Sequence, residues 1–364
     1  MSNQYNIAVL PGDGIGPEIT APCLEIMNKV LDCVGGVELH YETLRAGAAA
    51  YLNQGSALSD ETLERAKQAD AILLAAMGLP DVRYPDGTEI VPQIELREKL
   101  NLFAGVRPVR SIQGAPVTLA NPKAHHLDFV IVRESTEGLF AARRNGVIED
   151  DSIAKDTMEI TRDTSERLFD FSFKFTQKRK RKGKPGVLTC VDKANVLPSM
   201  AFFRKIFNER AARFPDVEAN HAYVDAAALN MVRCPWIFDV MVTENMYGDI
   251  LSDLGAGLIG GMGMAPSADI GDEYAVFQPC HGSAPDIMGT GKANPTAMIL
   301  SGAMLLEWLG DQRQDENCLK ASAIIYNAVD QAFGSGELLS CELGGSSGTK
   351  EISERISSEL VPMA

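Results

Sequence analysis

The feature that most constrains the fold of this chain is the alternation of short apolar runs with helical patterns. The run Ile7–Leu10 predicts a buried strand, and Pro17 suits the first turn of the helix expected after it. Helical spacing places five apolar residues on one face of that helix: Ile19, Cys23, Met27, Val30 and Leu31. Further strands are expected at Ala71–Ala75, Phe129–Val132, Val187–Val191, Ala222–Val224 and Val240–Thr243, and further helices at Glu61–Gln68 and Met200–Arg213. This order predicts an α/β protein with a mostly parallel sheet.

One segment, about residues 139–161, departs from this order. Asn145-Gly146 is a strong signal for a hairpin turn, and polar and apolar residues roughly alternate over 156–161. We therefore expect an antiparallel ribbon inserted in the α/β chain. Because a protruding ribbon leaves unpaired strand edges that a second subunit could cover, the insertion favours a dimer.

Composition and charge disfavour several classes of function. The formal charge of −15 disfavours nucleic-acid binding, and no apolar run approaches the ~20 residues that span a bilayer. The first residues carry no basic segment followed by an apolar one, so we expect no secretory signal. Seven scattered cysteines, none in a C-x-x-C pair, favour reduced thiols in the cytoplasm. The basic run at 178–184 predicts a solvated loop, with a nuclear address or a polyanion-binding patch as the alternative.

Three arginines lie where a small anion could bind. Arg97 and Arg107 are ten residues apart, and Arg133 directly follows an expected buried strand. Guanidinium groups suit carboxylates because their paired N–H donors match the two carboxylate oxygens. Taken singly, each arginine is more typical of a surface ion pair than of a binding site.

Acidic residues follow in a pattern that suits a divalent metal. Asp249 and Asp253 are four residues apart, on one face of an expected helix, and Asp225 follows an expected strand. Carboxylate oxygens are ligands that Mg²⁺ and Mn²⁺ prefer, so the three form a candidate metal site. The alternative is that Asp249 and Asp253 stabilise a helix N-terminus through its dipole. Lys193 also follows an expected strand and is a candidate proton carrier.

Two glycine-containing segments are candidates for close backbone approach. Gly12-Asp13-Gly14-Ile15-Gly16 follows a strand, but it lacks the full G-x-G-x-x-G fingerprint of dinucleotide binding and favours a tight strand-to-helix corner. The segment from His281 to Ile287, with Asn294 close behind, predicts a flexible binding loop.

In this order, the motifs resemble the β-decarboxylating dehydrogenases, which act on isocitrate, isopropylmalate, homoisocitrate, tartrate or D-malate. The resemblance runs from Gly12–Glu18 to Gly344–Thr349 and is strongest over Thr243–Asp253 and His281–Ile287. It implies an isocitrate/isopropylmalate dehydrogenase-like fold with two domains around a mostly parallel sheet, and an antiparallel clasp ribbon. The cofactor-side domain would comprise residues 1–104 and 261–364, and the substrate and dimer domain 105–260, with the clasp at about 139–161.

The resemblance also implies roles for individual residues. The substrate-binding residues would be Arg97, Arg107, Arg133, Gln93 and Asn195. The metal ligands would be Asp225, Asp249 and Asp253, and the catalytic residues Lys193 and Asp225. The cofactor NAD would bind to His281, Gly282, Ser283, Ala284, Asp286, Ile287 and Asn294. In such a homodimer, Lys193 and Asp225 would reach into the partner's cleft, so the active sites would be shared.

The implied reaction is oxidation of a malate-core (R)-2-hydroxy diacid with NAD and Mg²⁺ or Mn²⁺, followed by β-decarboxylation, as in 3-isopropylmalate dehydrogenase. Asp286 stands where NADP-using relatives carry lysine, which favours NAD. Phe140 stands where the family carries a tyrosine that acts as an acid. Val91 stands at the serine of isocitrate enzymes, whereas Ile90 and Gln93 stand at a glutamate and a leucine of isopropylmalate enzymes. Neither specificity signature is intact.

These departures leave alternatives open. Within the enzymes, they are a tartrate- or D-malate-type dehydrogenase, one that oxidises without decarboxylating, and an isocitrate or homoisocitrate dehydrogenase. A magnesium-dependent hydrolase or phosphotransferase would use Asp249 and Asp253, but the chain has no phosphate-binding loop of the P-loop type. An inactive regulatory subunit is disfavoured because every arginine and aspartate of the expected site is present, together with Lys193.

Overall fold

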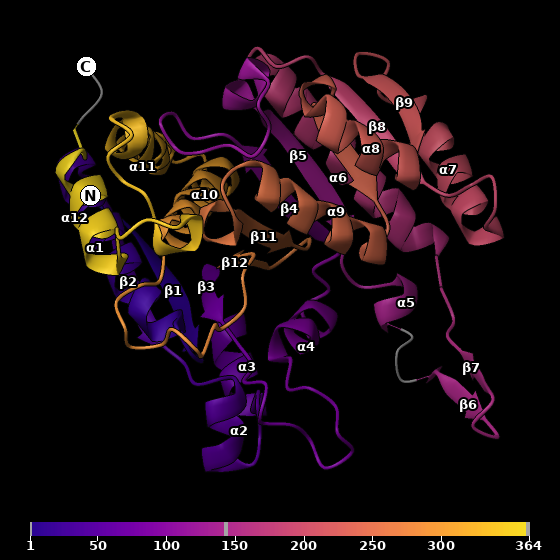
Figure 1. Ribbon diagram of the computed structural model, residues 1–364, viewed down its shortest axis with the longest axis horizontal. Helices are drawn as coiled ribbons and strands as arrows, with labels where there is room; N and C mark the ends of the chain where they lie inside the picture. Colours follow the sequence, from indigo (N-terminus) through magenta and orange to yellow (C-terminus); the bar gives the residue numbers. More distant parts are fainter. Residues whose placement is uncertain (1, 142–144, 362–364) are drawn as a thin grey trace.

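The computed structural model describes residues 2–141 and 145–361 of the 364-residue chain (Figure 1). One ten-stranded sheet runs through the molecule in the order β2-β1-β3-β12-β11-β4-β5-β10-β8-β9. Its strands are β1 (Asn3–Gly12), β2 (Val37–Thr43), β3 (Ala71–Ala76), β4 (Ala104–Arg110), β5 (Asp128–Glu134), β8 (Val187–Asp192), β9 (Glu218–Tyr223), β10 (Val240–Thr243), β11 (Pro266–Ile270) and β12 (Ala275–Pro279). Six of its neighbouring pairs are parallel and three, all involving β11 or β4, are antiparallel. The predicted α/β fold with a mostly parallel sheet is confirmed.

Helices cover both faces of this sheet (Figure 1). They are α1 (Gly16–Val34), α2 (Ala48–Gln54), α3 (Asp60–Lys67), α4 (Pro92–Lys99), α5 (Gly138–Ala141), α6 (Arg162–Arg181), α7 (Pro198–Ala211), α8 (Val224–Arg233), α9 (Asn245–Leu258), α10 (Thr296–Arg313), α11 (Glu316–Gly334) and α12 (Thr349–Ser358). One continuous core packs α1, α10, α11, α6 and α7 against one face. On the other face, separate cores lie under α3 and α4 and under α8 and α9. No helix among the described residues is long and apolar enough to cross a bilayer.

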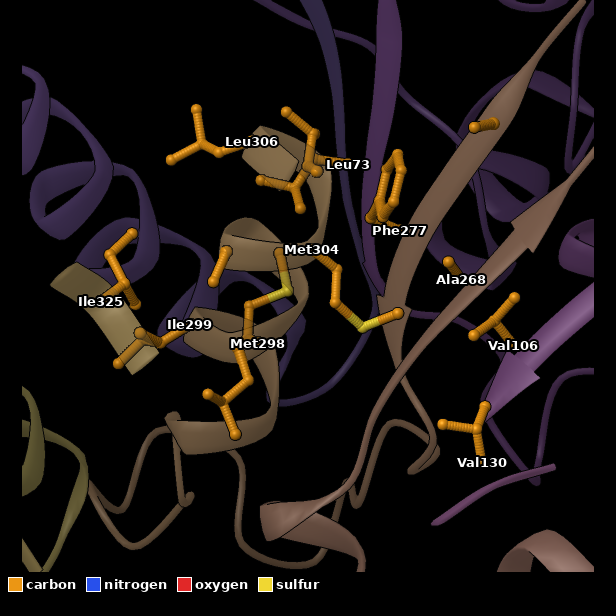
Figure 2. Close-up of a cluster of buried hydrophobic side chains, with 14 of the residues drawn as sticks. Leu73, Val106, Val130, Ala268, Phe277, Met298, Ile299, Met304, Leu306 and Ile325 are labelled. Atoms are coloured by element: carbon orange, nitrogen blue, oxygen red, sulfur yellow. The ribbon is translucent and has the colours of Figure 1, made fainter. Parts of the chain in front are cut away.

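In the middle of the sheet, apolar side chains of the strands point to the face that α10 covers. Leu73, Phe277, Ala268, Val106 and Val130 come from five neighbouring strands and lie in one apolar cluster with residues of α10 (Figure 2). Successive side chains in a strand point to opposite faces. The neighbours of these apolar residues therefore face the other way, between the two smaller cores.

Most of the predicted elements agree with the structure, but the strand predicted at Ala222–Val224 is wrong at its end. The strand is β9, Glu218–Tyr223, and Val224 is already the first residue of α8. β9 lies at the edge of the sheet and most of its residues are exposed. An exposed edge strand carries no apolar run, so the pattern revealed only its last residues.

The basic run at 178–184 is not a solvated loop as a whole. Its first four residues form the last turn of α6. Lys178 and Lys182 pair with Glu307, Arg179 with Asp239, and Lys184 with Asp128. Cations at a helix C-terminus are favoured by the helix dipole, and here they also pair with neighbouring acids.

The predicted antiparallel ribbon is present, but its predicted turn is wrong. β6 (Val147–Glu149) pairs with β7 (Ile153–Lys155), and the ribbon projects away from the sheet (Figure 1). The turn lies at Asp150 and Asp151, with φ of 51° and 52°, and not at Asn145-Gly146. A type I′ hairpin turn needs positive φ at both central residues, which aspartate tolerates better than most side chains. Arg143 and Arg144, which precede the expected turn, lie outside the described residues.

The second strand expected at 156–161 is also wrong, because that segment pairs only through a single bridge between Gly138 and Glu159. The predicted domain boundaries remain a prediction. The strand order is compatible with them, since β2, β1, β3, β12 and β11 occupy one half of the sheet and the strands of 104–243 the other.

Candidate active site

A cavity of about 390 Å³ lies on the face of the sheet opposite α10, between the two smaller cores. A volume of this size suits a small ligand. Its walls come from the end of β3, from α4, β4, β5, α5 and α9, and from β11, β12 and the loop after β12. The polar and aromatic residues that line it are Gln93, Arg97, Arg107, Arg133, Phe140, Asp249, Ser252, Asp253, Ser267, Gln278, Cys280 and His281.

The pleat of the strands gathers these polar side chains on one face. Val106 and Phe277 belong to the apolar core with α10, so Arg107 and Gln278, which follow them, point into the cavity. Arg133 follows the buried Val132 in the same way. A polar residue that interrupts an apolar strand is therefore the sequence signal of this site.

Arg97, Arg107 and Arg133 form one wall of the cavity, called the arginine wall below. The carboxylate of Asp269 links the first two of them, which come from α4 and β4. Arg97 of α4 donates from Nε to Asp269 Oδ2 at 3.0 Å, and Arg107 of β4 donates from Nη2 to Asp269 Oδ1 at 2.9 Å. The side chain of Arg107 is 5% exposed, and that of Arg97 is 12% exposed. Both guanidinium groups are thus fixed on one side by Asp269 while they line the cavity on the other.

Arg133 completes the wall and connects it to α9. Its Nε and Nη2 atoms donate to Asn245 Oδ1 at 3.0 and 2.7 Å, and Nη1 donates to Asp249. Burial and the neighbouring charge of Arg97 lower the pKa of Arg133 to about 10. A buried cation in this position is stabilised by an additional anion, as a bound carboxylate would provide.

Asp249 and Asp253 lie on α9 at i and i+4, as expected, and line the same cavity. They do not act as N-terminal helix acids, because the first turn of α9 contains no acid and Glu244 caps the helix by accepting from Met246 N and Tyr247 N. Burial and the nearby charge of Asp249 raise the pKa of Asp253.

The donor set of these two acids is compatible with a divalent metal. Mg²⁺ commonly binds through one or two carboxylates and keeps its other positions for water and substrate oxygens. Across residues 2–141 and 145–361, however, no group of three or more His, Cys, Asp or Glu side chains is arranged to hold a metal. Asp225 therefore does not join Asp249 and Asp253 within one chain.

Lys193 and Asp225 form a pair of their own. Lys193 Nζ donates to Asp225 Oδ1 at 2.8 Å, and this hydrogen bond lowers the pKa of Asp225. The side chain of Asp225 is 69% exposed, and Asn195, two residues after Lys193, is also exposed. None of the three is among the residues that line the described cavity.

The loop His281–Ile287 lies beside the cavity and rests on the glycine corner after β1. Ser283 O accepts from Ile15 N at 2.8 Å, and Ser283 Oγ donates to Gly78 O. Gly14 has φ +57°, and a Cβ atom there would lie 2.0 Å from Ser283 O. The segment after β1 is thus a tight strand-to-helix corner that supports the loop.

The residues expected to bind the cofactor differ in whether they line the cavity, lie exposed or pack in the core. His281 and Gly282 line the cavity, Ala284 has φ +37°, and Asp286 is exposed. Burial lowers the pKa of His281. Ile287 packs against the main core. Asn294 is 7% exposed and holds the start of α10, since its Oδ1 accepts from Thr296 N at 3.1 Å and its Nδ2 donates to Glu342 at 2.8 Å.

The sequence profile of the isocitrate/isopropylmalate dehydrogenase family matches residues 6–356 of the chain. The chain belongs to this family. It is 39% identical over 364 residues to the 3-isopropylmalate dehydrogenase of Aquifex aeolicus, covering 97% of this chain and 96% of that protein. It is 38% identical over 354 residues to the 3-isopropylmalate/3-methylmalate dehydrogenase of Methanocaldococcus jannaschii, covering 97% and 98%.

Solved structures agree with this assignment. An isocitrate dehydrogenase from Methylococcus capsulatus matches with a TM-score of 0.85 and 35% identity, covering 98% of this chain and 99% of that one. The apo form of a β-decarboxylating dehydrogenase from Thermococcus kodakarensis matches with a TM-score of 0.79 and 35% identity, covering 98% and 96%. The chain is therefore a hydroxy-acid dehydrogenase, and dehydrogenases of this family generally use NAD and a divalent metal.

Of the residues at which this dehydrogenase departs from its family, some line the cavity and others do not. Gln93 lines the cavity, and its Oε1 atom is buried without a hydrogen-bond partner among the described residues. Phe140 also lines the cavity, and the guanidinium of Arg133 lies 5.6 Å from the centre of its ring. Ile90 is fully buried in a small core with Ala48 and Ala57 and does not line the described cavity.

Sequence reasoning missed several polar groups of this dehydrogenase. Asp269, Asn245 and Gln278 all contact the arginines or their partners, and none was expected in the site. For Asp269 and Gln278, a signal existed: each is a polar residue inside a short apolar strand, next to Ala268 and Phe277. Asn245 lies inside the motif that resembles the family, without a pattern of its own.

Proposed function

We propose that this dehydrogenase catalyses the NAD-dependent, Mg²⁺- or Mn²⁺-dependent oxidation of a malate-core (R)-2-hydroxy diacid followed by β-decarboxylation, as a 3-isopropylmalate dehydrogenase does. The observation that carries the proposal is the single cavity in which Arg97, Arg107 and Arg133 face Asp249 and Asp253. Cationic and metal-binding groups across one small space suit a substrate with two carboxylates and a neighbouring hydroxyl. The names of the relatives support the same substrate class.

Each wall of the cavity has its own task in this proposal. The arginines bind the carboxylate that later leaves, and their hydrogen bonds to Asp269 and Asn245 hold the guanidinium groups in place before the substrate arrives. Asp249 and Asp253 would hold the metal, which supplies Lewis-acid polarisation of the 2-hydroxyl group. Loss of hydride from C2 to NAD leaves a 2-keto acid, whose keto group accepts the electrons released when the C3 carboxylate departs as CO₂.

Lys193 and Asp225 enter this proposal from a second subunit. Their ion pair lies outside the cavity of the described chain, yet a base is needed to accept the hydroxyl proton. Apolar side chains are exposed on the ribbon at Val147 and Ile148, on α8 at Leu229 and Val232, and on α9 at Ile250. These surfaces favour a homodimer whose interface brings Lys193, Asp225 and Asn195 to the partner's cavity, with Asp225 completing the metal ligands.

We propose NAD and not NADP as the cofactor because an acidic residue, Asp286, lies exposed in the loop after β12. Its carboxylate could accept hydrogen bonds from a free ribose, whereas it would repel the additional phosphate of NADP. Support for the position of the loop comes from two hydrogen bonds of Ser283, one from Ile15 N of the glycine corner and one to Gly78 O after β3.

A second candidate is a tartrate- or D-malate-type dehydrogenase, or one that oxidises without completing decarboxylation. Gln93 favours it, because an unpaired amide oxygen in the substrate cavity suits a polar substituent better than an isopropyl group. Phe140 also favours incomplete decarboxylation, since a phenyl ring cannot donate a proton to the product carbon.

The experiment that tests the proposal is a substrate panel. NADH formation is measured with NAD⁺ and Mn²⁺ on 3-isopropylmalate, 3-methylmalate, D-malate, the tartrates, isocitrate and homoisocitrate. We expect one of the dicarboxylates to have the highest kcat/KM. Highest activity on tartrate or D-malate would select the second candidate, whereas highest activity on a tricarboxylate would contradict the proposed substrate class.

A further inference from the structure

Asp269 is a charged residue inside the protein that none of the roles above accounts for. It lies on β11 with its side chain 1% exposed, and it is not among the residues that line the described cavity. Its Oδ1 atom accepts from Arg107 at 2.9 Å, and its Oδ2 atom accepts from Arg97 at 3.0 Å and from Gln278 Nε2 at 2.5 Å. The carboxylate therefore lies directly behind the arginine wall.

The local structure is shaped to hold this carboxylate. Asp269 is opposite Gly105 in the pairing of β11 with β4. A Cβ atom at Gly105 would lie 3.0 Å from Asp269 Oδ1 and 2.7 Å from Ser135 Oγ. Because glycine leaves this space free, the Asp269 side chain reaches both arginines without displacing the neighbouring strand.

The carboxylate is ionised in this position. Burial alone would raise the pKa of Asp269, but the charges of Arg107, Arg97 and Arg133 lower it to about 2. One of the three positive charges on the wall is thus neutralised from behind before any ligand binds. Most of the donors of Arg133, by contrast, are used by Asn245 and Asp249 on the other side.

We propose that Asp269 is a positioning and specificity-determining residue, which orients Arg97 and Arg107 and reduces the charge of the arginine wall so that it accepts one carboxylate and not two. A ligand with a second carboxylate near the wall would meet fewer unpaired donors and less positive charge, and its extra charge would remain poorly compensated. The binding part of this proposal concerns the wall alone; its consequence for the substrate rests on the proposed function.

Inorganic sulfate is the probe for the binding part, because it is a dianion that needs no metal, cofactor or turnover. Its dissociation constant is measured by calorimetry at low ionic strength for the wild type and for Asp269→Asn, which keeps the size of the side chain. We expect the variant to bind sulfate about tenfold more tightly or better, because a full charge is removed within a few ångströms of the site. A purely structural role would instead leave the binding unchanged or weaken it.

Asp239→Asn is the matched control. Asp239 is 1% exposed and also pairs with an arginine, Arg179, but neither residue lines the described cavity. We expect this variant to lose stability while it binds sulfate as the wild type does. In the double variant Asp269→Asn/Gln278→Glu, a carboxylate returns beside the same arginines, and sulfate affinity should return toward the wild-type value.

Unchanged or weaker sulfate binding by a folded Asp269→Asn variant would overturn the proposal. If that variant does not fold, Gln278→Glu alone decides the question. A second carboxylate beside Asp269 should weaken sulfate binding by a similar factor, and no weakening would overturn the proposal.

The substrate part is tested separately. The ratio of kcat/KM for isocitrate to that for the best dicarboxylate should rise about tenfold in Asp269→Asn, whereas inactivity of the wild type on all diacids would count against the proposed function and not against the sulfate result.

Discussion

Replacing Gly14 with alanine should weaken NAD binding through the loop it supports, without any change in the residues that contact substrate. The residue has φ +57°, and its added Cβ atom would lie 2.0 Å from Ser283 O and 2.8 Å from Ser283 Cβ. Backbone atoms cannot remain at that separation, so the loop must retreat by roughly 1 Å. Retreat also breaks the 2.8 Å hydrogen bond from Ile15 N to Ser283 O.

The expected magnitude follows from these contacts. A left-handed alanine costs about 1–2 kcal/mol, and loss of one buried hydrogen bond costs about 0.5–1.5 kcal/mol more. We expect the free energy of unfolding to fall by about 1.5–3.5 kcal/mol. Because the loop would move by about 1 Å from its cofactor-binding position, we expect a loss of at least about 1.4 kcal/mol of binding free energy, which is a tenfold rise in the dissociation constant for NAD.

Gly55→Ala provides the control for the backbone effect. Gly55 has φ +74° at the end of α2, and a Cβ atom there would have no neighbour within 4 Å. The Gly55→Ala variant should lose about 1–2 kcal/mol of stability because alanine is strained in this left-handed backbone conformation. It should bind NAD as the wild type does. Chemical denaturation and calorimetric NAD titration of both variants measure the two effects. If Gly14→Ala binds NAD as tightly as Gly55→Ala does, the loop His281–Ile287 is not the cofactor site.

Three further predictions concern the cofactor, the missing acid and the dimer. Asp286→Lys should shift the ratio of kcat/KM for NAD to that for NADP by about tenfold or more toward NADP, since an exposed repulsion becomes an attraction; an unchanged ratio would place the ribose elsewhere. Phe140→Tyr should raise the CO₂ released per NADH formed on the best substrate, because general acid catalysis is worth ~10²–10⁴-fold. If wild type already gives one CO₂ per NADH and the variant changes neither rate nor ratio, the acid is not needed. Lys193→Ala and Asp249→Asn proteins, each inactive, should recover part of the activity when refolded together, because each hybrid dimer would contain one intact cleft. Proven hybrids without activity would contradict shared sites.

The fold was predictable because burial leaves a periodic signal. Strands such as Ile7–Leu10 are wholly buried and read as apolar runs, and α1 buries all five apolar residues of its predicted face. The errors lie where burial gives no signal. β9 is an exposed edge strand, and the turn of the ribbon depends on the backbone angles of Asp150 and Asp151, which no hydrophobic pattern encodes.

The candidate site was predictable where a residue lies at the end of a strand or in a helical repeat. Arg133, Asp249 and Asp253 met those conditions, and they share one cavity. Asp269 stands out as a polar residue inside an apolar strand, but its contact with the arginines depends on the pairing of β11 with β4, and sequence patterns do not give strand order. Lys193 and Asp225 show a third limit: they do not line the cavity of the described chain, and a site that we propose to be shared between subunits would be incomplete in either chain alone.

The measurement that tests the central claim most directly is the Mn²⁺ concentration that gives half-maximal NADH formation on the best diacid. The wild type should be inactive with a chelator and saturate as Mn²⁺ is added, whereas Asp253→Asn should need at least about tenfold more Mn²⁺. Asp311→Asn, which removes a surface partner of Lys178, is the control and should titrate as the wild type does. Full wild-type activity in the chelator, or an Asp253→Asn titration that matches the wild type, would contradict metal-assisted oxidation in this cavity.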